Sequence, residues 1–449
     1  MRAGAGGAVA LIDGASGARI TYAELAEQVG AAAERLRADA GPGGIAFLFA
    51  GNDVTTVVEL LGALMAGVPV ALIDRRLDGA LVDGLIERYR PEVVRGAARA
   101  GTPDGPPVHP DLALLLSTSG STGSPKLVRL TRAAVEANAR AIAATLELRP
   151  GDVAPTSLPI HYSFGLSVVT SHLAAGATVL LTDAGLVTDE FWRLCREHGA
   201  TSLAGVPYSF QMLRRLDLGK VAPPSLRTLT QAGGRLEPAL VRHFHDVARA
   251  RDGRLFVMYG QTEATARIAV LPPGELPARA GAVGRALPGG ELRIVRDGAA
   301  VAAGEVGEVI YRGPNVMMGY AEGRAELARG DDLGGELATG DLGYLDGDGF
   351  LWITGRSKRI AKVFGLRVSL DELEAMARAQ PDAPAVAAIA GADRVTIFLE
   401  GADEAAAAAC RQALSARTGI HPSGFVVTPI AVLPRLPSGK LDYRALEGA

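Results

Sequence analysis

A run of hydroxyl residues and glycines between two apolar segments carries the clearest chemical signal in this sequence. Residues 112–130 read LALLLSTSGSTGSPKLVRL. The first five predict a short buried strand, and the rest predict a loop closed by Pro125 and Lys126. Glycines let such a loop turn backbone N–H groups toward a ligand, while hydroxyls and an ammonium add donors and positive charge. The loop is therefore suited to hold phosphate oxygens.

Two other interpretations of this loop are less favoured. A Ser/Gly tract can be a flexible linker, but a linker is not expected between two apolar strands. A nucleotide-triphosphatase loop of the form G-x-x-x-x-G-K-[ST] requires glycine before the lysine and a hydroxyl residue after it. Pro125 and Leu127 occupy those positions here, so the spacing fails. A phosphate-handling role remains the better interpretation.

The loops after the next predicted strands also carry glycines and polar side chains. Short apolar strands are expected at 153–156, 178–181, 202–206, 228–231 and 255–258, alternating with helices. This alternation predicts a largely parallel sheet, whose ligands bind at the carboxyl ends of the strands. The loops at those ends are PIHYSFG at 159–165, GVPY at 205–208, QAGGR at 231–235 and YGQTE at 259–263.

The remaining elements predict a mixed α/β chain. Thr21 and Glu24 form a capping box that opens a helix to about residue 38, and another helix is capped near Asn52. Strands are expected at 45–49, 69–72 and near residue 93, and a further helix begins at about residue 78. From about Ala266 the chain changes to glycine-punctuated strands, which predict a small antiparallel sheet or barrel. Residues 346–349, DGDG, are typical of a hairpin turn. After residue 355 comes a smaller α/β segment with helices near 371–378 and 404–416.

Length and composition set the outer limits. A chain of 449 residues is expected to form two or more domains. Its 46 Lys and Arg against 49 Asp and Glu leave no basic excess for nucleic acid or an anionic membrane. The longest apolar run, residues 60–73, is broken by glycine and proline and is too short to span a bilayer. Cys195 and Cys410 have no metal or redox spacing and are expected to be buried thiols of a cytoplasmic protein.

Five motifs in a fixed order give the chain a family resemblance. They are the loop at 118–126, YGQTE at 259–263, ATGD at 338–341, GR at 355–356 and PSGK at 437–440. Together they resemble the adenylate-forming superfamily, which includes acyl-CoA synthetases, adenylation domains of nonribosomal synthetases and firefly luciferase. The resemblance covers nearly the whole chain. It implies an AMP-binding core over 1–355, with a β-barrel at about 266–355, and a mobile α+β domain over 356–449 with its hinge near Lys358.

The chemistry implied by this resemblance is attack of a carboxylate on the α-phosphate of ATP. The products are acyl-AMP and pyrophosphate, and the acyl group then passes to a thiol. Such a reaction needs the charge of the triphosphate to be offset, the reacting atoms to be aligned and water to be kept from the mixed anhydride. The implied cofactors are ATP, Mg²⁺ and either CoA or the phosphopantetheine of a carrier protein.

The resemblance also assigns site residues. The phosphate-binding positions are Thr118, Ser119, Gly120, Ser121, Thr122, Gly123 and Lys126. The other nucleotide-binding positions are Gly233, Gly234 and Arg235 along adenine, Tyr259, Gly260 and Gln261, Asp341 at the ribose hydroxyls, Ile353, and Arg356. Thr262 is implied at the α-phosphate and Glu263 at Mg²⁺. Lys440 is implied to bridge the carboxylate and the α-phosphate, and Gly365 to line the thiol channel after the domain rotates.

Each of these acids and bases also has a plainer interpretation. Glu263 could be a surface acid at a helix start, Asp341 a turn residue, and Lys440 a solvated lysine in a loop. Their occurrence together in one ordered set favours the functional roles. Lys358 stands where the family commonly has Asp, Leu127 where it commonly has Gly, and both ends of the chain are short for the family. These departures leave the oligomeric state open.

The gate loop of the family corresponds to residues 159–165. Tyr162 is the candidate for an aromatic gate between acyl pocket and thiol channel, with a packed core tyrosine as the alternative. His161 is either a polar pocket residue or, slightly favoured, a structural histidine. The implied pocket walls are Tyr162, Phe164, Val206, Ala232 and Met258. Amino-acid-activating members of the family carry an Asp in this loop that pairs with the substrate's ammonium. None occurs between residues 156 and 171, so the resemblance implies a substrate without an α-amine, and the mostly apolar walls suit a fatty or aromatic acid.

The leading hypothesis is an AMP-forming acyl- or aryl-CoA ligase. The runner-up is an enzyme that loads a carrier-protein phosphopantetheine, and a third is transfer of the adenylate to an amine or another nucleophile. A non-catalytic nucleotide-binding homologue is the alternative from another class. Retention of Lys126, Glu263, Asp341 and Lys440 argues against that alternative.

Overall fold

The computed structural model describes residues 6–99, 101, 105–117, 126–356, 359–364, 366–378, 385–391, 394–436 and 439–447. The chain divides into two compact units. The first consists of Met1–Glu291 and Tyr311–Leu337, and the second of Leu292–Ile310 and Ala338–Ala449. The domain boundary at residue 356 stays a prediction, and its hinge residue Lys358 lies outside the described residues.

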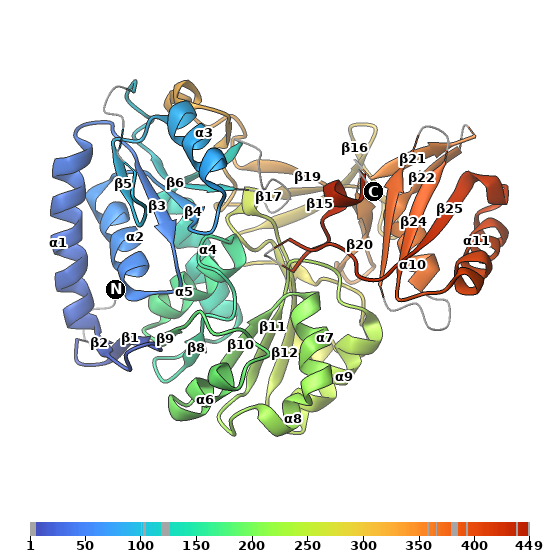
Figure 1. Cartoon of the computed structure of the whole chain (residues 1–449), viewed down its shortest axis with the longest axis horizontal. Coiled ribbons are helices and arrows are strands. Elements are labelled where there is room, and N and C mark those ends of the chain that lie inside the picture. Colours follow the sequence, from blue (N-terminus) through green and yellow to red (C-terminus); the bar gives the residue numbers. More distant parts are fainter. Residues whose placement is uncertain are drawn as a thin grey trace. The chain divides into compact units, whose positions relative to one another are not determined.

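A six-stranded sheet supports the predicted phosphate loop in the first unit (Figure 1). Its strands are β18 (Gly319–Ala321), β7 (Leu127–Thr131), β6 (Leu112–Ser117), β4 (Val70–Asp74), β3 (Ala46–Ala50) and β5 (Val93–Arg95), in that order across the sheet. The four strands from β6 to β5 are parallel, whereas β7 is antiparallel to β6 and β18 is antiparallel to β7. The predicted buried strand before the loop is confirmed, since the side chains of Leu114, Leu115 and Leu116 are fully buried.

The helices of this sheet begin close to where the sequence places them. They are α1 (Tyr22–Ala40), α2 (Val54–Ala66) and α3 (Gly79–Tyr89). The capping box of Thr21 and Glu24 is present at α1. The cap of α2 is Asp53 rather than Asn52, because the carboxylate of Asp53 accepts the Thr56 N–H at 2.8 Å. Asn52 contacts the gate loop instead.

The five later strands predicted from the sequence all exist, but they belong to two sheets rather than one. One sheet runs in the order β10 (Ser202–Gly205), β11 (Thr228–Gln231), β12 (Arg254–Tyr259), β13 (Ala269–Leu271) and β14 (Arg285–Ala286). The other runs β2 (Arg19–Thr21), β1 (Val9–Asp13), β9 (Thr178–Leu181) and β8 (Val153–Pro155). The two sheets part between β8 and β10, and the N-terminal strand β1 extends the sheet of β8 and β9 by pairing in parallel with β9.

Helices fill the space between these sheets. α4 (Arg132–Thr145) packs on β6 and β7, α5 (Ser163–Ala175) packs on β8 and β9, and the two helices pack on each other. α7 (Pro207–Leu216) contacts β10, and α9 (Pro238–Arg249) contacts β12 (Figure 1). The other short elements of this unit are α6 (Asp189–Glu197), α8 (Leu218–Val221), η1 (Thr262–Ala264), η2 (Pro273–Glu275) and η3 (Arg324–Ala328).

The second unit holds the predicted glycine-punctuated strands as a five-stranded sheet. Its order is β16 (Ala299–Ala300), β15 (Glu291–Arg296), β17 (Gly307–Arg312), β19 (Glu336–Leu345) and β20 (Leu351–Arg356). The predicted hairpin turn between β19 and β20 is confirmed. The N–H of Asp346 donates to the carbonyl of Phe350 at 3.0 Å, and the N–H of Gly349 donates back to the carbonyl of Asp346 at 2.9 Å.

The C-terminal segment of this unit forms its own small α+β core. The elements are β21 (Ile360–Val363), β22 (Leu366–Ser369), α10 (Leu370–Arg378), β23 (Val386–Ala390), β24 (Val395–Glu400), α11 (Glu404–Thr418), η4 (Pro422–Gly424), β25 (Phe425–Ile430) and α12 (Tyr443–Glu447). β23, β24 and β25 form one sheet, and the buried side chains of Val386, Ile397, Leu414 and Phe425 belong to one cluster. Both helices predicted here are confirmed.

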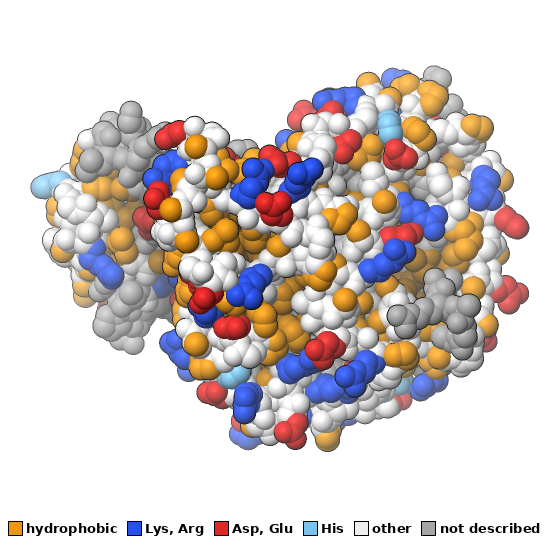
Figure 2. All heavy atoms as spheres, turned by 180° about the vertical axis from the view of Figure 1, so that it is seen from behind, with side chains coloured by type: hydrophobic (Ala, Val, Ile, Leu, Met, Phe, Trp, Pro, Cys, Tyr) orange, Lys and Arg blue, Asp and Glu red, His pale blue; other side chains and the backbone are white. Residues whose placement is uncertain are grey.

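The surface agrees with the near-balanced composition. Basic and acidic side chains are interspersed over the face shown in Figure 2. In the part of the chain that the structure describes, every helix is too short or too polar to cross a bilayer.

Candidate active site

Tyr320 joins the predicted phosphate-loop lysine to the predicted magnesium ligand. β18 pairs with β7 so that Tyr320 lies opposite Val128, two positions beyond Lys126. The ammonium nitrogen of Lys126 lies 3.5 Å from the centroid of the Tyr320 ring. The Tyr320 hydroxyl donates a 2.8 Å hydrogen bond to Oε1 of Glu263. One tyrosine therefore contacts both charged groups, Lys126 through the face of its ring and Glu263 through its hydroxyl.

A buried arginine fixes the strand that carries Tyr320. The guanidinium of Arg129 is fully buried and donates to the carbonyls of Met318 and Tyr320, at 3.1 and 3.2 Å. It also pairs with Oδ2 of Asp332 at 2.6 Å. Because one side chain of β7 satisfies carbonyls on both sides of Gly319, the position of Tyr320 against β7 is strongly determined.

A buried network of hydrogen bonds fixes the backbone that follows the YGQTE segment. Asn315 donates to the carbonyls of Ala264 and Arg267, at 2.8 and 2.9 Å. The backbone of Thr265 has a φ of 62°, and its hydroxyl donates to the carbonyl of Asn315 at 2.8 Å. A Cβ atom at Gly260 would lie 2.0 Å from the carbonyl oxygen of Ala266, so only glycine fits this turn.

Thr262 lies beside the start of the gate helix. Its hydroxyl is 3.1 Å from the hydroxyl of Ser163, the first residue of α5, and both side chains are buried. Thr262 is the position implied at the α-phosphate. The contact thus brings the predicted reacting centre next to the predicted acyl pocket, within the first unit.

The predicted adenine segment follows β11 directly. The side-chain amide of Gln231 donates to the carbonyl of Gly234 at 2.9 Å and so holds the loop of Gly233, Gly234 and Arg235. Among the described residues, Oε1 of Gln231 and Nε2 of Gln261 are buried without a hydrogen-bond partner. Buried polar atoms of this kind are costly unless a ligand or water satisfies them. They are therefore candidate contacts for a nucleotide.

Glu263 fits the role of a magnesium ligand. Its carboxylate is half-buried, and its carbonyl accepts the N–H of Met317 at 2.9 Å, which fixes the backbone. Within the described segments, Oε1 accepts from Tyr320, and Oε2 has no hydrogen-bond partner. Mg²⁺ prefers one or two carboxylates with water and substrate phosphate oxygens rather than an all-protein cage. One carboxylate with an open oxygen meets that requirement.

The predicted pocket walls lie together. Phe164, Val206, Ala232 and Met258 are buried in one apolar cluster, and Tyr162 packs against it. The rings of Tyr162 and Phe164 meet edge to face, with centroids 6.4 Å apart. Burial raises the pKa of Tyr162 to about 12, so its phenol stays protonated at neutral pH. The structure therefore gathers all five wall residues at the N-terminal half of α5.

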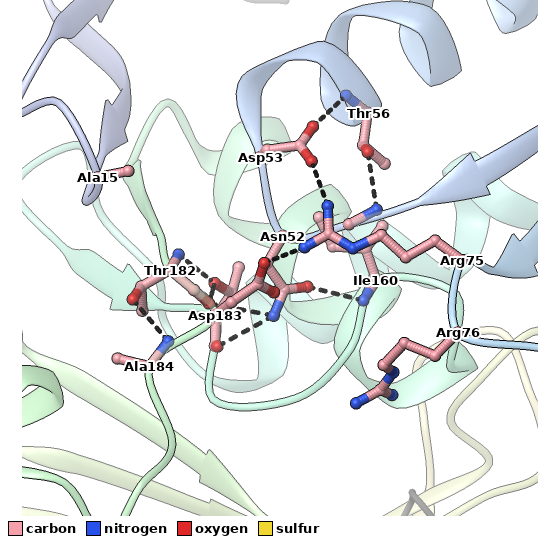
Figure 3. Close-up of polar contacts among 12 residues, drawn as sticks. Ala15, Asn52, Asp53, Thr56, Arg75, Arg76, Ile160, Thr182, Asp183 and Ala184 are labelled. Carbon is pink, nitrogen blue, oxygen red and sulfur yellow. Dashed lines mark hydrogen bonds and ion pairs between the residues drawn. The ribbon is translucent and has the colours of Figure 1, made fainter. Parts of the chain in front are cut away.

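The gate loop is tied to neighbouring strand ends by polar contacts. Asn52 accepts the N–H of Ile160 at 3.0 Å and donates to the carbonyl of Thr182 at 3.1 Å (Figure 3). Nε2 of His161 lies 3.5 Å from Oδ2 of Asp74, at the end of β4. Burial lowers the pKa of His161 in spite of the attraction of Asp74. These contacts favour the structural interpretation of His161.

Arg75 forms ion pairs with two acids near the gate loop, Asp53 and Asp183. Figure 3 shows Arg75 between Asp53, at 3.2 Å, and Asp183. All three side chains are partly exposed, so the ion pairs add little stability. They link the cap of α2 to the end of β9, beside the loop that carries the gate.

In the second unit, Asp341 and Arg356 face each other across the β19–β20 pair. Nε of Arg356 lies 3.0 Å from Oδ1 of Asp341, whose side chain is buried, whereas the Arg356 side chain is exposed. Ile353 pairs with Gly343 in the same ladder. The predicted ribose contact and its neighbouring arginine are thus one ion pair at the edge of a hairpin.

Lys440 ends a tight turn in the same unit. The N–H of Leu436 donates to the carbonyl of Lys440 at 2.8 Å, and Gly439 has a φ of 78°. The turn fixes the backbone that carries the lysine. The remaining predicted site residues lie outside the described residues; they are Thr118, Ser119, Gly120, Ser121, Thr122, Gly123, Lys358 and Gly365.

Sequence reasoning missed the residues that organise this site. They are Arg129, Ser163, Arg267, Asn315 and Tyr320. Nothing in the local sequence around Tyr320 marks it, because its partners Lys126 and Glu263 are far away in the chain. The available signal in the sequence was an arginine inside a predicted apolar strand, as at Arg129, because a buried charge requires partners.

The lysine, the half-open carboxylate and the adjoining apolar pocket fit the nucleotide-dependent enzyme expected from the sequence. A sequence profile described as AMP-binding enzyme matches residues 2–96 and 87–321. The chain belongs to this AMP-binding enzyme family.

Several curated relatives are named as CoA ligases. The chain is 34% identical over 296 residues to an indoleacetate–CoA ligase of Aromatoleum aromaticum, covering 65% of this chain and 57% of that one. It is 32% identical to a sulfoacetate–CoA ligase of Cupriavidus necator, covering 75% and 67%. It is 30% identical to a 2-succinylbenzoate–CoA ligase of Bacillus licheniformis, covering 84% and 83%.

Solved structures share the fold over nearly the full chain. The o-succinylbenzoate CoA synthetase of Bacillus subtilis with ATP and magnesium superposes with a TM-score of 0.80 at 25% identity, covering 98% of this chain and 96% of that one. ATP-bound MatB of Rhodopseudomonas palustris gives 0.82 at 25% identity, covering 100% and 96%. The fold class expected from the sequence is confirmed.

Proposed function

We propose that this protein uses ATP to activate a carboxylic acid as acyl-AMP, releasing pyrophosphate, and then transfers the acyl group to the thiol of CoA. The observation that carries the proposal is the contact of Tyr320 with both Lys126 and Glu263. An ammonium suited to phosphate oxygens and a carboxylate suited to Mg²⁺ thus both contact one side chain, which supports the proposal. The relatives named as ligases of indoleacetate, sulfoacetate and 2-succinylbenzoate support the same reaction class.

The first unit would bind the triphosphate and the acid. Lys126 and the hydroxyl loop at 118–123 would offset the charge of the β- and γ-phosphates. Glu263 would hold Mg²⁺, which lowers the repulsion between the entering carboxylate and the phosphates when it is bound. Thr262 would contact the α-phosphate beside the pocket, and Tyr162 would separate the pocket from the thiol.

The second unit would supply the ribose contact and the mobile cation. Asp341 would accept hydrogen bonds from the ribose hydroxyls, with Arg356 beside it. Lys440 would bridge the carboxylate and the α-phosphate during adenylation. Rotation about Lys358 would then replace Lys440 by the segment that contains Gly365. The protein would act in the cytoplasm, where ATP, CoA and reduced thiols are present.

ATP–pyrophosphate exchange across a panel of carboxylic acids tests the first half of the proposal. At least one acid should support exchange, and Glu263→Gln should lower it by about 100-fold or more. If no acid of the panel supports exchange, the non-catalytic alternative is left. The matched control is Glu136→Gln, because Glu136 is an exposed acid on α4.

The acceptor is tested in a second stage. With the active acid, ATP and CoA, the expected product is the acyl-CoA thioester. Formation of a thioester only on a holo carrier protein would favour the carrier-loading alternative. If neither thioester forms although ATP–pyrophosphate exchange continues, the acceptor would be an amine or another nucleophile.

A further inference from the structure

Arg267 is buried beside the predicted acyl pocket, and no carboxylate of the described residues pairs with it. Its guanidinium lies 4.0 Å from the centroid of the Phe164 ring. One terminal nitrogen donates to the hydroxyl of Ser167 at 3.2 Å, and the other makes a long 3.4 Å contact with the carbonyl of Ala266. Nε is buried and has no hydrogen-bond partner among the described residues.

The other buried arginines show what is missing. Arg129 pairs with Asp332 at 2.6 Å, and Arg324 pairs with Glu92 at 2.9 Å. Arg267 is 2% exposed, and within the described segments no Asp or Glu pairs with it. A charge buried without a partner is strongly disfavoured. The face of the Phe164 ring offsets only part of that cost.

Arg267 keeps its charge in spite of burial. Desolvation lowers its pKa to about 10, which still leaves the guanidinium protonated at neutral pH. The chain therefore maintains a permanent positive charge inside a pocket whose described lining holds no carboxylate. A ligand that brings a negative charge to this position would supply the missing partner.

Arg267 is among the residues that line a small cavity between α4, α5 and the strands β8, β10, β11 and β12. Its volume is about 20 Å³. Phe164 and Met258, two of the expected pocket walls, line it together with Arg267. Residues that carry hydroxyl groups also line it; they are Ser167, Ser171, Ser202, Thr228 and Thr230. The space admits a small polar group but not a long alkyl chain.

We infer that Arg267 binds a second anionic group of the substrate, so that the acid activated by this enzyme is a short dicarboxylic or sulfo-carboxylic acid. The inference rests on the proposed function. One carboxylate would react at Thr262, and the second anion would pair with the guanidinium of Arg267. Arginine suits this task because its planar fork binds carboxylate and sulfonate oxygens in a bidentate manner.

The test compares acids that differ only in the second charge. ATP–pyrophosphate exchange is measured with succinate against butyrate, glutarate against pentanoate, and 3-sulfopropanoate against butyrate. Wild-type kcat/KM is expected to be at least about tenfold higher for the dianion of each pair. The carboxylate and sulfonate arms show which anion the site prefers.

Variants then locate the preference. Arg267→Met should lower kcat/KM for the preferred dianion by about 100-fold and leave the monoanion unchanged or improved. Arg267→Lys keeps a positive charge but loses the planar guanidinium, so its kcat/KM for the dianion should lie between those of wild type and Arg267→Met. Arg140→Met removes an exposed arginine of α4 and should leave every ratio unchanged.

Separate outcomes distinguish this inference from the proposed function. Exchange with monoanions at least equal to that with dianions, or equal losses for both in Arg267→Met, overturns the role of Arg267 and leaves the function intact. If no acid of either kind supports exchange, both the role of Arg267 and the proposed function are overturned. If Arg267→Met fails to fold, the wild-type ratio and the Arg267→Lys ratio still decide the question.

Discussion

The Tyr320 hydroxyl lies 2.8 Å from Oε1 of Glu263, although 57 positions separate these residues in the sequence. Tyr320 is on β18, the edge strand of the six-stranded sheet, and Glu263 is in the short helix η1 after β12. The hydrogen bond therefore links two sheets of the first unit. It also leaves Oε2 of Glu263 open, so the bond orients the carboxylate without occupying it.

Tyr320→Phe is expected to weaken the use of Mg²⁺ more than the binding of the acid. The variant keeps the ring beneath Lys126 but loses the hydrogen bond to the carboxylate, a bond worth about 1.5–3 kcal/mol. The Mg²⁺ concentration for half-maximal ATP–pyrophosphate exchange should rise by about tenfold or more, with the KM of the acid nearly unchanged.

Two controls accompany that measurement. Tyr344→Phe removes a hydroxyl from a tyrosine that stacks on Trp352 and should leave the Mg²⁺ dependence unchanged. In the double variant with Glu263→Gln, the loss should be smaller than the sum of the single losses, because the two side chains share one interaction. Additive losses would contradict the coupling.

Arg129→Met is expected to destabilise the first unit. The change leaves the Asp332 carboxylate and the carbonyls of Met318 and Tyr320 without their donor, and breaking a buried pair costs about 3–5 kcal/mol. Urea unfolding should show the loss. Arg132→Met, on the exposed start of α4, should change the free energy of unfolding by less than about 0.5 kcal/mol. Equal stabilities would show that Arg129 does not hold β18.

Asp341→Asn is expected to remove discrimination at the ribose. Hydrogen bonds to a charged acceptor contribute about 1.5–3 kcal/mol, so the KM of ATP should rise by about 10-fold to 100-fold. The decisive reading is the ratio of kcat/KM for ATP over 2′-deoxyATP. That ratio should fall toward one in the variant, and a ratio equal to that of wild type would remove Asp341 from the ribose site.

Lys440→Ala is expected to slow adenylation by about 100-fold or more, since one donor aimed at developing charge contributes about 2.7–4 kcal/mol. Thioester formation from pre-formed acyl-adenylate should keep its rate, because the resemblance gives Lys440 no part in that step. Lys220→Ala, at an exposed lysine paired with Asp217, serves as the control. An unchanged adenylation rate would refute the role of Lys440.

His172 should make the protein less stable in mild acid. Its ring is buried, with Nδ1 2.8 Å from the carbonyl of Val168 and Nε2 3.2 Å from the hydroxyl of Ser202. Burial lowers its pKa below 6.5, so below that pH the unfolded chain binds a proton that the folded chain does not. The free energy of unfolding should therefore fall with decreasing pH, by up to about 1.4 kcal/mol per pH unit from this group.

The check is the slope of melting temperature against pH between 7 and 5. His172→Gln should flatten that slope, whereas His421→Gln, at an exposed histidine, should leave it unchanged. A slope for His172→Gln equal to that of wild type would mean that another group carries the pH dependence.

The sequence alone determined what depends on local patterns. The capping box of Thr21 and Glu24 and the hairpin turn at Asp346 were predicted because their hydrogen bonds close within a few residues. The strand before the phosphate loop followed from its run of leucines. The ordered motifs also predicted the family, since each motif is contiguous in the chain.

Tertiary structure decided the contacts between distant segments. Only folding shows that the five expected strands belong to two sheets and that β18 places Tyr320 beside Lys126. Only folding shows, too, that no acid among the described residues pairs with Arg267 as Asp332 and Glu92 pair with Arg129 and Arg324. Periodicity and motif spacing report on neighbours along the chain. Strand pairing and charge burial depend on which surfaces meet in three dimensions. Local sequence patterns do not show which distant segments come into contact.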